Sequence, residues 1–472
     1  MEEKMSFIRH KKFGQKTYAY EVTSYWDAEL KKPRQKSIYL GMVGEADGKP
    51  TKRVKVQPEQ SIVDFGDGYA LFEMARVSGL SEVIMSSFED AQSILALMSY
   101  QLLDGHAMCH AEEWASGNMT SRLYPGAKLG SQEVSRLLKY LGQESTQRVF
   151  FKHYVARFFQ GKKGLLIDST ALASAINTSL NAWGYGAEGI CEHVNCVMLV
   201  DKESKLPIYF RAVSGDIPDV SVLGNTLDEI ARLGIEADQA ILDAGFYSEK
   251  NIKLLCERNI NFITRLPKSR TLFKTLTDQI GDIETRKYAC MYGERALFIK
   301  EETISVCDTL MYAYIVLDPD KKAKDTRLLL KEALEKPDHD ADVDLQIKKG
   351  GLFILISKTQ IPLQEVLPAY YTRQNIEQVF GFAKSNNNLL PLRVHSRDAI
   401  NGYLLLVFMT LSLFIMLRQK LQPKLTMDAA LISLRNLKAK IYDKEIIPQE
   451  LNKKSKTIFD QLEIMVPKML GV

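Results

Sequence analysis

Residues 368–393 read PAYYTRQNIEQVFGFAKSNNNLLPLR, and this segment predicts a single helix. At about 100° per residue, four of its polar side chains fall within an arc of roughly 60°: Tyr370, Arg373, Glu377 and Lys384. The adjoining arc is apolar, which indicates a helix packed against a sheet by one flank. One carboxylate therefore lies among a phenol and two cations, which suits a metal ion at Glu377 with phosphates beside it. The alternative is an ordinary i, i+4 salt bridge from Arg373 to Glu377 on a solvated face.

Two aspartates upstream each follow a short apolar run that predicts a strand. Residues 165–167 (LLI) precede Asp168, and residues 240–242 (AIL) precede Asp243. A carboxylate at a strand end is held at the rim of the sheet, where open α/β sheets place their ligands. If the strands are neighbours, both carboxylates can share one divalent ion, and Glu377 can supply a ligand for a second. Oxygen ligands without histidine favour magnesium or manganese, and two such ions suit in-line displacement at phosphorus.

Three motifs resemble those of a known family. The spacing Tyr370-x2-Arg373-x3-Glu377-x6-Lys384 is similar to the Tyr-Arg-Glu-Lys signature of DDE insertion-sequence transposases, the family called insertion sequence four. Residues 165–170 (LLIDST) resemble that family's first-aspartate motif, and residues 241–247 (ILDAGFY) resemble its second. The resemblance spans about residues 160–420. It implies a ribonuclease H-like catalytic domain interrupted by a β-rich insertion, and metal-dependent DNA strand cleavage and transfer.

The resemblance also implies roles for individual residues. The catalytic, metal-binding residues would be Asp168, Asp243 and Glu377. The contacts to the phosphates of the element ends would be Tyr370, Arg373 and Lys384. The cofactor would be Mg²⁺ or Mn²⁺, as two ions, and the partners would be double-stranded DNA of the element ends and the target, with a homodimer in the synaptic complex. The role of an aromatic that stacks on a flipped base stays unassigned, because residues 274–349 contain no Trp.

The whole chain predicts an α/β protein in five parts. The sheet is expected to be mixed, with flanking helices, since three strands in sequence precede helix–strand–helix–strand. Residues 1–57 carry thirteen Lys or Arg against seven Asp or Glu, and a basic arm suits a polyanion. The expected parts are a basic β-hairpin arm (1–57), a helical, DNA-binding domain (58–160), the ribonuclease H-like domain (161–267 and 351–420), the β-rich insertion (268–350) and a C-terminal helical extension (421–472).

Other classes of protein fit less well. The six cysteines form no CxxC pair, which indicates a reducing cytosol without disulfides and leaves Cys191, His193 and Cys196 short of a zinc site. The apolar run 402–417 is shorter than a membrane span needs, so it predicts a buried core helix. The expected location is the cytoplasm of a prokaryote, at the nucleoid when DNA is bound.

Two alternatives of other classes stay open. The first is a DNA-binding protein descended from a transposase that no longer cleaves, which the presence of all three acidic residues disfavours. The second is another ribonuclease H-like nuclease, such as a junction resolvase. Such enzymes are smaller and do not need the helical domain, the insertion and the C-terminal extension.

Overall fold

The computed structural model describes residues 6–14, 16–27, 32–43, 50–51, 61–174, 178–186, 189–335, 343–385, 394–443 and 445–471. The chain divides into two compact units. The first comprises Met1–Ser61 with Ile441–Glu445, and the second comprises Ile62–Lys440 with Ile446–Val472. Each unit is described here by itself.

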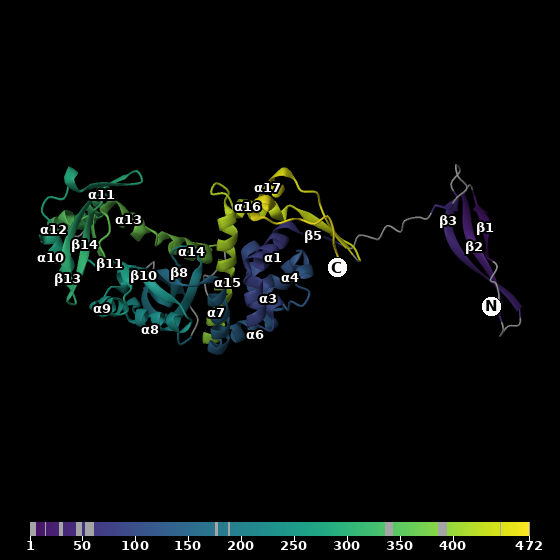
Figure 1. Cartoon of the computed structure of the whole chain (residues 1–472), viewed down its shortest axis with the longest axis horizontal. Helices are drawn as coiled ribbons and strands as arrows, with labels where there is room; N and C mark the ends of the chain where they lie inside the picture. Colours follow the sequence, from purple (N-terminus) through teal and green to yellow (C-terminus); the bar gives the residue numbers. More distant parts are fainter. Residues whose placement is uncertain are drawn as a thin grey trace. The chain divides into compact units, whose positions relative to one another are not determined.

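The N-terminal unit is an antiparallel sheet of four strands in the order β1-β2-β3-β4 (Figure 1). They are β1 (Ser6–Phe13), β2 (Lys16–Asp27), β3 (Lys32–Val43) and the short β4 (Pro50–Thr51). The predicted two-stranded hairpin is therefore too small. Every second position of β1 is a cation or an aromatic ring rather than an aliphatic side chain, and that pattern hid the strand. Residues 32–36, which are rich in Lys and Arg, belong to strand β3.

Helices α1 to α7 open the second unit. The longer ones are α1 (Gly66–Ser78), α2 (Leu80–Ser87), α3 (Ala91–Leu103), α6 (Ser131–Leu141) and α7 (Glu144–Phe158). The shorter ones are α4 (Ala111–Ser116) and α5 (Thr120–Leu123). All lie within the region predicted to be helical.

Helix α15 (Arg397–Lys420) contains the apolar run and joins these helices to the sheet. It packs on α1, α3 and α6 and also contacts strand β9 (Figure 1). It is long and apolar enough to cross a membrane, but 89% of its apolar window is buried inside the protein. A Cβ on Gly402 would lie 1.8 Å from the carbonyl oxygen of Leu138, so glycine is required where α15 crosses α6. The helix is a core element, as predicted.

Five strands of the central sheet have the order β9-β8-β6-β10-β11. These strands are β6 (Lys162–Ala173), β8 (Gly189–Asp201), β9 (Pro207–Ser214), β10 (Glu236–Leu242) and β11 (Asn261–Leu266). β8 is antiparallel to β6 and β9, whereas β6, β10 and β11 are parallel to one another. Strand β7 (Ala182–Gly186), which the sequence did not predict, pairs with β8. The order and directions are those of a ribonuclease H-like fold.

Two helices connect the parallel strands of this sheet. They are α8 (Asp219–Arg232), which leads into β10, and α9 (Glu249–Glu257), which leads into β11. Both are amphipathic, and their apolar side chains, such as Leu223 and Leu255, are buried. A helix between parallel strands is the connection that their direction requires.

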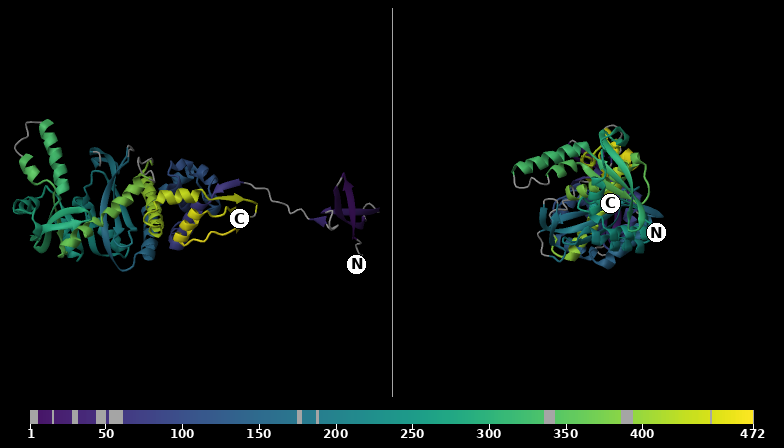
Figure 2. Two further views of the ribbon diagram at one scale, coloured as in Figure 1. Left: turned by 90° about the horizontal axis from the view of Figure 1, so that it is seen from above. Right: turned by 90° about the vertical axis from the view of Figure 1, so that its left-hand side faces the viewer.

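The insertion continues the same sheet. Strands β12 (Ala289–Tyr292), β13 (Arg295–Val306) and β14 (Thr309–Leu317) lead to β15 (Leu352–Ser357), which pairs with both β14 and β11. The inserted strands thus extend the central sheet to ten strands. The helices are α10 (Thr271–Asp278), which the sequence did not predict, α11 (Pro319–Glu335) and α12 (Val343–Lys348). Figure 2 shows α11 and α12, in green, side by side.

The segment 368–393 does not form the predicted single helix. Helix α13 (Leu363–Tyr371) ends before Thr372, and α14 (Gln374–Ser385) begins after Arg373. At this break the amides of Arg373, Asn375 and Ile376 donate to carbonyls three residues back rather than four. Such bonds tighten the turn and separate the two helices. Residues 386–393 lie outside the described part.

The C-terminal segment is not only helical. Helices α16 (Met427–Arg435) and α17 (Lys453–Leu462) alternate with β16 (Lys438–Ile441), β17 (Glu445–Pro448) and β18 (Leu470–Gly471). These strands form a sheet with β5 (Ser61–Asp64) in the order β18-β17-β16-β5. Strands of two to four residues carry no readable alternation, which is why the sequence predicted helices alone.

Candidate active site

The two aspartates lie side by side at the centre of the sheet. Strand β10 ends at Leu242, which pairs with Ile167 of β6, so Asp243 and Asp168 follow a matched pair of residues. Asp168 does not end its strand, because β6 stays paired with β8 as far as Ala173. It marks the point where β6 loses its neighbour on the β10 side. The predicted juxtaposition is present, although Asp168 lies within a strand rather than after one.

Arg373 connects all three predicted acidic residues. Its Nη1 donates to Asp168 Oδ2 at 2.9 Å, and its Nη2 donates to Glu377 Oε1 at 2.8 Å. The same Nη2 lies 3.7 Å from Asp243 Oδ1. The side chain of Arg373 is 16% exposed and that of Glu377 is 51% exposed, so the i, i+4 ion pair of the alternative interpretation is present and half-buried. Three carboxylates from β6, the end of β10 and α14 thus converge on one guanidinium.

Tyr370 completes the cluster from α13. Its hydroxyl donates to Asp243 Oδ1 at 3.4 Å, and its ring lies 5.8 Å from Arg373 Cζ. The residue is 4% exposed, and this burial raises the pKa of its hydroxyl, as does the neighbouring Asp243. Tyr370 therefore stays protonated and serves as a hydrogen-bond donor.

Burial dominates the electrostatics of Asp168. Desolvation raises the pKa of its carboxyl to about 7, Arg373 opposes the rise, and Asp243 and Glu377 add to it. The pKa of Arg373 is raised, because the surrounding carboxylates outweigh the effect of its burial. One guanidinium does not balance three acidic groups.

The donor set fits a hard divalent cation, since all three acidic side chains offer carboxylate oxygens. Among the residues that the structure describes, however, no group of three or more acidic, His or Cys side chains is close enough to hold an ion as it stands. The guanidinium of Arg373 lies between the carboxylates and supplies the positive charge there. An ion at this position therefore requires Arg373 to move aside.

Sequence reasoning missed two residues, Ser169 and Asp219, whose hydrogen bonds support Asp168. Ser169 donates its amide to Asp168 Oδ1 at 2.9 Å and its hydroxyl to Asp219 Oδ2 at 2.6 Å. A Cβ on Gly245 would lie 2.8 Å from the same Asp219 oxygen. The Asp219 carboxylate, at the start of α8, thus lies against Ser169, the residue after Asp168, and Gly245, two residues after Asp243. No spacing singles it out, because an acid in the first turn of a helix is common.

The comparison with known families agrees with this geometry. Residues 159–413, more than half of the chain, match the family described as the transposase DDE domain. The chain belongs to this family. Curated proteins give no match. Among solved structures, the transposase is similar to piggyBac transposase in a cryo-EM structure of its synaptic complex with hairpin DNA, at 10% identity and a TM-score of 0.41. That similarity covers 84% of this chain and 79% of the other.

Lys384 is the one predicted site residue whose position stays open. It lies in α14 of the transposase, but its side chain is outside the described residues. The other five predicted residues, Asp168, Asp243, Tyr370, Arg373 and Glu377, form the single cluster given above. Tyr371 stacks on Tyr292 of the insertion, with ring centroids 5.0 Å apart. The insertion therefore contacts the helix that carries Tyr370.

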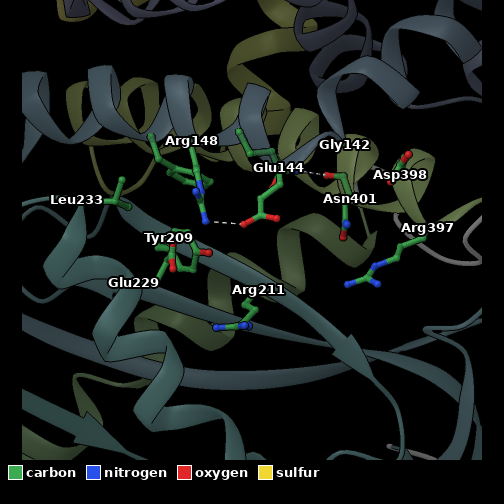
Figure 3. A pocket seen from close by; sticks show the side chains of 12 residues that line it. Gly142, Glu144, Arg148, Tyr209, Arg211, Glu229, Leu233, Arg397, Asp398 and Asn401 are labelled. Carbon is green, nitrogen blue, oxygen red and sulfur yellow. Dashed lines mark hydrogen bonds and ion pairs between the residues drawn. The ribbon is translucent and has the colours of Figure 1, made fainter.

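A separate cavity of about 420 Å³ lies between the helices and strand β9 (Figure 3). None of Asp168, Asp243 and Glu377 lines it. Its arginines are matched by an equal number of acidic side chains, and Arg148 is paired with Glu144. The charged residues are Arg148, Arg211, Arg397, Glu144, Glu229 and Asp398. The cavity carries no net formal charge, which disfavours it as a phosphate site of the transposase.

Proposed function

We propose that this transposase belongs to the insertion sequence four group and moves an insertion sequence by cutting and joining DNA at its terminal inverted repeats. The observation that carries the proposal is the convergence of Asp168, Asp243 and Glu377 on Arg373. The Tyr-Arg-Glu-Lys spacing supports the assignment to the group. It also supports a prokaryotic cytoplasm as the location and a homodimer that joins two ends.

The three carboxylates would hold two divalent ions, Mg²⁺ or Mn²⁺. When bound, such ions activate the attacking oxygen and stabilise the leaving oxygen of a phosphodiester. Asp168 and Asp243, fixed by neighbouring strands, would hold the reacting end of the site rigid. Glu377 would add a third carboxylate to the site from helix α14.

Arg373 has two roles in this proposal. Without DNA it neutralises the carboxylates, as its contacts with Asp168 and Glu377 support. With the carboxylates neutralised by bound cations, its guanidinium would be available to pair with a phosphate of the element end, for which its planar donors are suited. Tyr370, protonated and beside Asp243, would donate to the same backbone, and Lys384 would hold a further phosphate.

Strand cleavage by the purified protein tests the proposal. A labelled duplex with the terminal inverted repeat should be nicked in the presence of Mg²⁺ and left intact with a chelator. Asp168→Ala, Asp243→Ala and Glu377→Ala should each abolish nicking and leave binding of the duplex largely intact. Asp238→Ala, an exposed acid in the same strand β10, is the matched control and should nick like the wild type. Efficient nicking by Glu377→Ala would refute the assignment of the triad.

The division of the chain into five parts also stays a proposal. A transposase needs a surface that recognises the element ends as well as a catalytic centre. The helical region was expected to supply it. Its charge does not favour that role, because residues 58–160 carry eight Lys or Arg against twelve Asp or Glu.

A further inference from the structure

One face of the N-terminal sheet gathers aromatic rings and three cations with no acidic side chain among the described residues. The other face carries four cations, Lys12, Lys32, Arg34 and Lys36, but also the acidic Glu21. Paired residues of neighbouring strands point to the same face of a sheet. Arg9 pairs with Tyr20, Lys11 with Tyr18, and Tyr20 with Tyr39. With Lys16, which pairs with Phe13, these residues define what we call the aromatic-basic face: Arg9, Lys11, Lys16, Tyr18, Tyr20 and Tyr39.

Arg9 and Lys11 of this face lie beside aromatic rings rather than beside acidic side chains. Lys11 Nζ lies 5.3 Å from the ring centroid of Tyr20, and Arg9 Cζ lies 5.4 Å from that of Phe7. Tyr39 packs against Tyr20 and Tyr18, with ring centroids 5.4 and 6.1 Å apart. Arg9 also donates to Gln35 Oε1 at 3.4 Å. A cation above a ring keeps its full charge available to a further anion.

The acidic residues of these strands stand on the other face. Glu21 pairs with Ile8 and Ile38, and Asp27 pairs with Lys32, so both occupy positions opposite to the aromatic-basic face. Large rings are exposed as well, since Phe13 and Trp26 are each 61% exposed. Exposed rings of this size on a small sheet indicate a contact surface. The absence of acids from this face, among the described residues, makes a polyanion the complementary partner.

We propose that the aromatic-basic face binds duplex DNA of the element ends. This inference rests on the proposed function, which makes such ends the substrate. The pair β1–β2 carries all three cations of the face, and the major groove admits a two-stranded ribbon. Arg9, Lys11 and Lys16 would contact phosphates or base edges. The tyrosine hydroxyls and Gln35 would add polar contacts. Residues 58–160 carry more acidic than basic side chains, so the N-terminal sheet suits DNA better than that helical region does.

The test compares two full-length double variants that lose the same charge from opposite faces. Arg9→Ala with Lys11→Ala alters the aromatic-basic face, whereas Lys12→Ala with Lys36→Ala alters the other. The probe is a labelled duplex copied from the DNA that flanks the coding sequence. Its Kd is measured over a series of salt concentrations. The first variant should bind on the order of 10–100-fold more weakly at low salt, with a salt slope smaller by about 2, while the control should keep the wild-type slope.

Other outcomes would overturn the inference. They are equal losses in both variants, an unchanged slope in the first, or tighter binding of single-stranded DNA than of the duplex. A third variant, Tyr39→Ser, tests the rings and should weaken binding without a change in slope; wild-type binding by it would contradict their role. Nicking at saturating DNA separates this inference from the proposed function. The control variant, Lys12→Ala with Lys36→Ala, should nick at the wild-type rate, whereas a wild-type protein that binds but never nicks would refute the proposed catalysis alone.

Discussion

Removal of the Arg373 side chain gives a stability change whose size and pH dependence follow from the structure. Arg373→Ala leaves the buried Asp168 without its cation, and the two side chains are 16% and 11% exposed. Breaking a buried ion pair by removal of one partner costs about 3–5 kcal/mol. The variant should therefore lose about 3 kcal/mol of unfolding free energy near pH 8, where Asp168 is ionised.

The sign of the pH dependence is fixed by the raised pKa of Asp168. The folded protein holds this proton to about pH 7, whereas the ordinary pKa is 3.8, so the contribution of Asp168 is full below the ordinary value and is lost as pH rises through 7. Arg373 lowers this pKa, so its removal raises the pKa further. Near pH 5 the variant holds a neutral Asp168, and the expected loss falls to about 1 kcal/mol.

Urea denaturation near both pH values measures these losses. The control is Arg232→Ala, whose ion pair with Glu229 lies on the surface with the arginine 70% exposed. It should cost at most about 0.5–1 kcal/mol at either pH. Mg²⁺ should restore part of the stability of Arg373→Ala near pH 8, since an ion that binds only the folded state stabilises it. Equal losses at both pH values, or a loss no larger than the control's, would refute this account of the site.

Three further predictions concern Asp219 and Ser169, the helix crossing and the reaction. Asp219→Ala should slow nicking and raise the Mg²⁺ concentration needed for half-maximal rate. Ser169→Ala should have the same effects more weakly. Unchanged Mg²⁺ dependence in both variants would show that Asp219 and Ser169 do not position Asp168. Gly402→Ala should lower the unfolding free energy by on the order of 3 kcal/mol, because overpacking forces backbone shifts. The control Gly224→Ala, in α8, should be neutral or stabilising. Comparable melting temperatures of the two variants would contradict the close contact of α15 with α6 at Gly402. Nicking at limiting Mg²⁺ should rise with pH up to about 7, since ion binding needs ionised Asp168; a flat profile from about pH 5 to 8 would contradict that requirement.

The sequence predicted that the carboxylates of Asp168, Asp243 and Glu377 lie together because their spacing and order are local signals. Each aspartate follows a buried apolar run, and the register of β6 with β10 then brings Asp168 and Asp243 together. Helical periodicity likewise placed Tyr370, Arg373 and Glu377 on one side. The structure contains the salt bridge between Arg373 and Glu377, and it also brings Asp168 and Asp243 to the same guanidinium. Periodicity along one helix does not reveal that convergence.

Other features depended on contacts between distant segments. Asp219 touches Ser169 and Gly245 only because α8 begins at the edge where both catalytic strands meet. The break between α13 and α14 was not expected, since Thr372 and Arg373 are ordinary helix residues. The strands of the C-terminal segment were too short to show a period. They are strands because they pair with one another and with β5, and such pairing between distant segments cannot be read from local sequence.

The most direct test of the central claim is strand nicking by Glu377→Gln beside the wild type. This change removes the charge and keeps the shape, so the end duplex should bind with an unchanged Kd. The wild type should nick the duplex in Mg²⁺ and release a 3′-hydroxyl, whereas the variant should not nick it at any Mg²⁺ concentration. Nicking by the variant within about tenfold of the wild-type rate, a difference of only about 1.4 kcal/mol in the barrier, would contradict it.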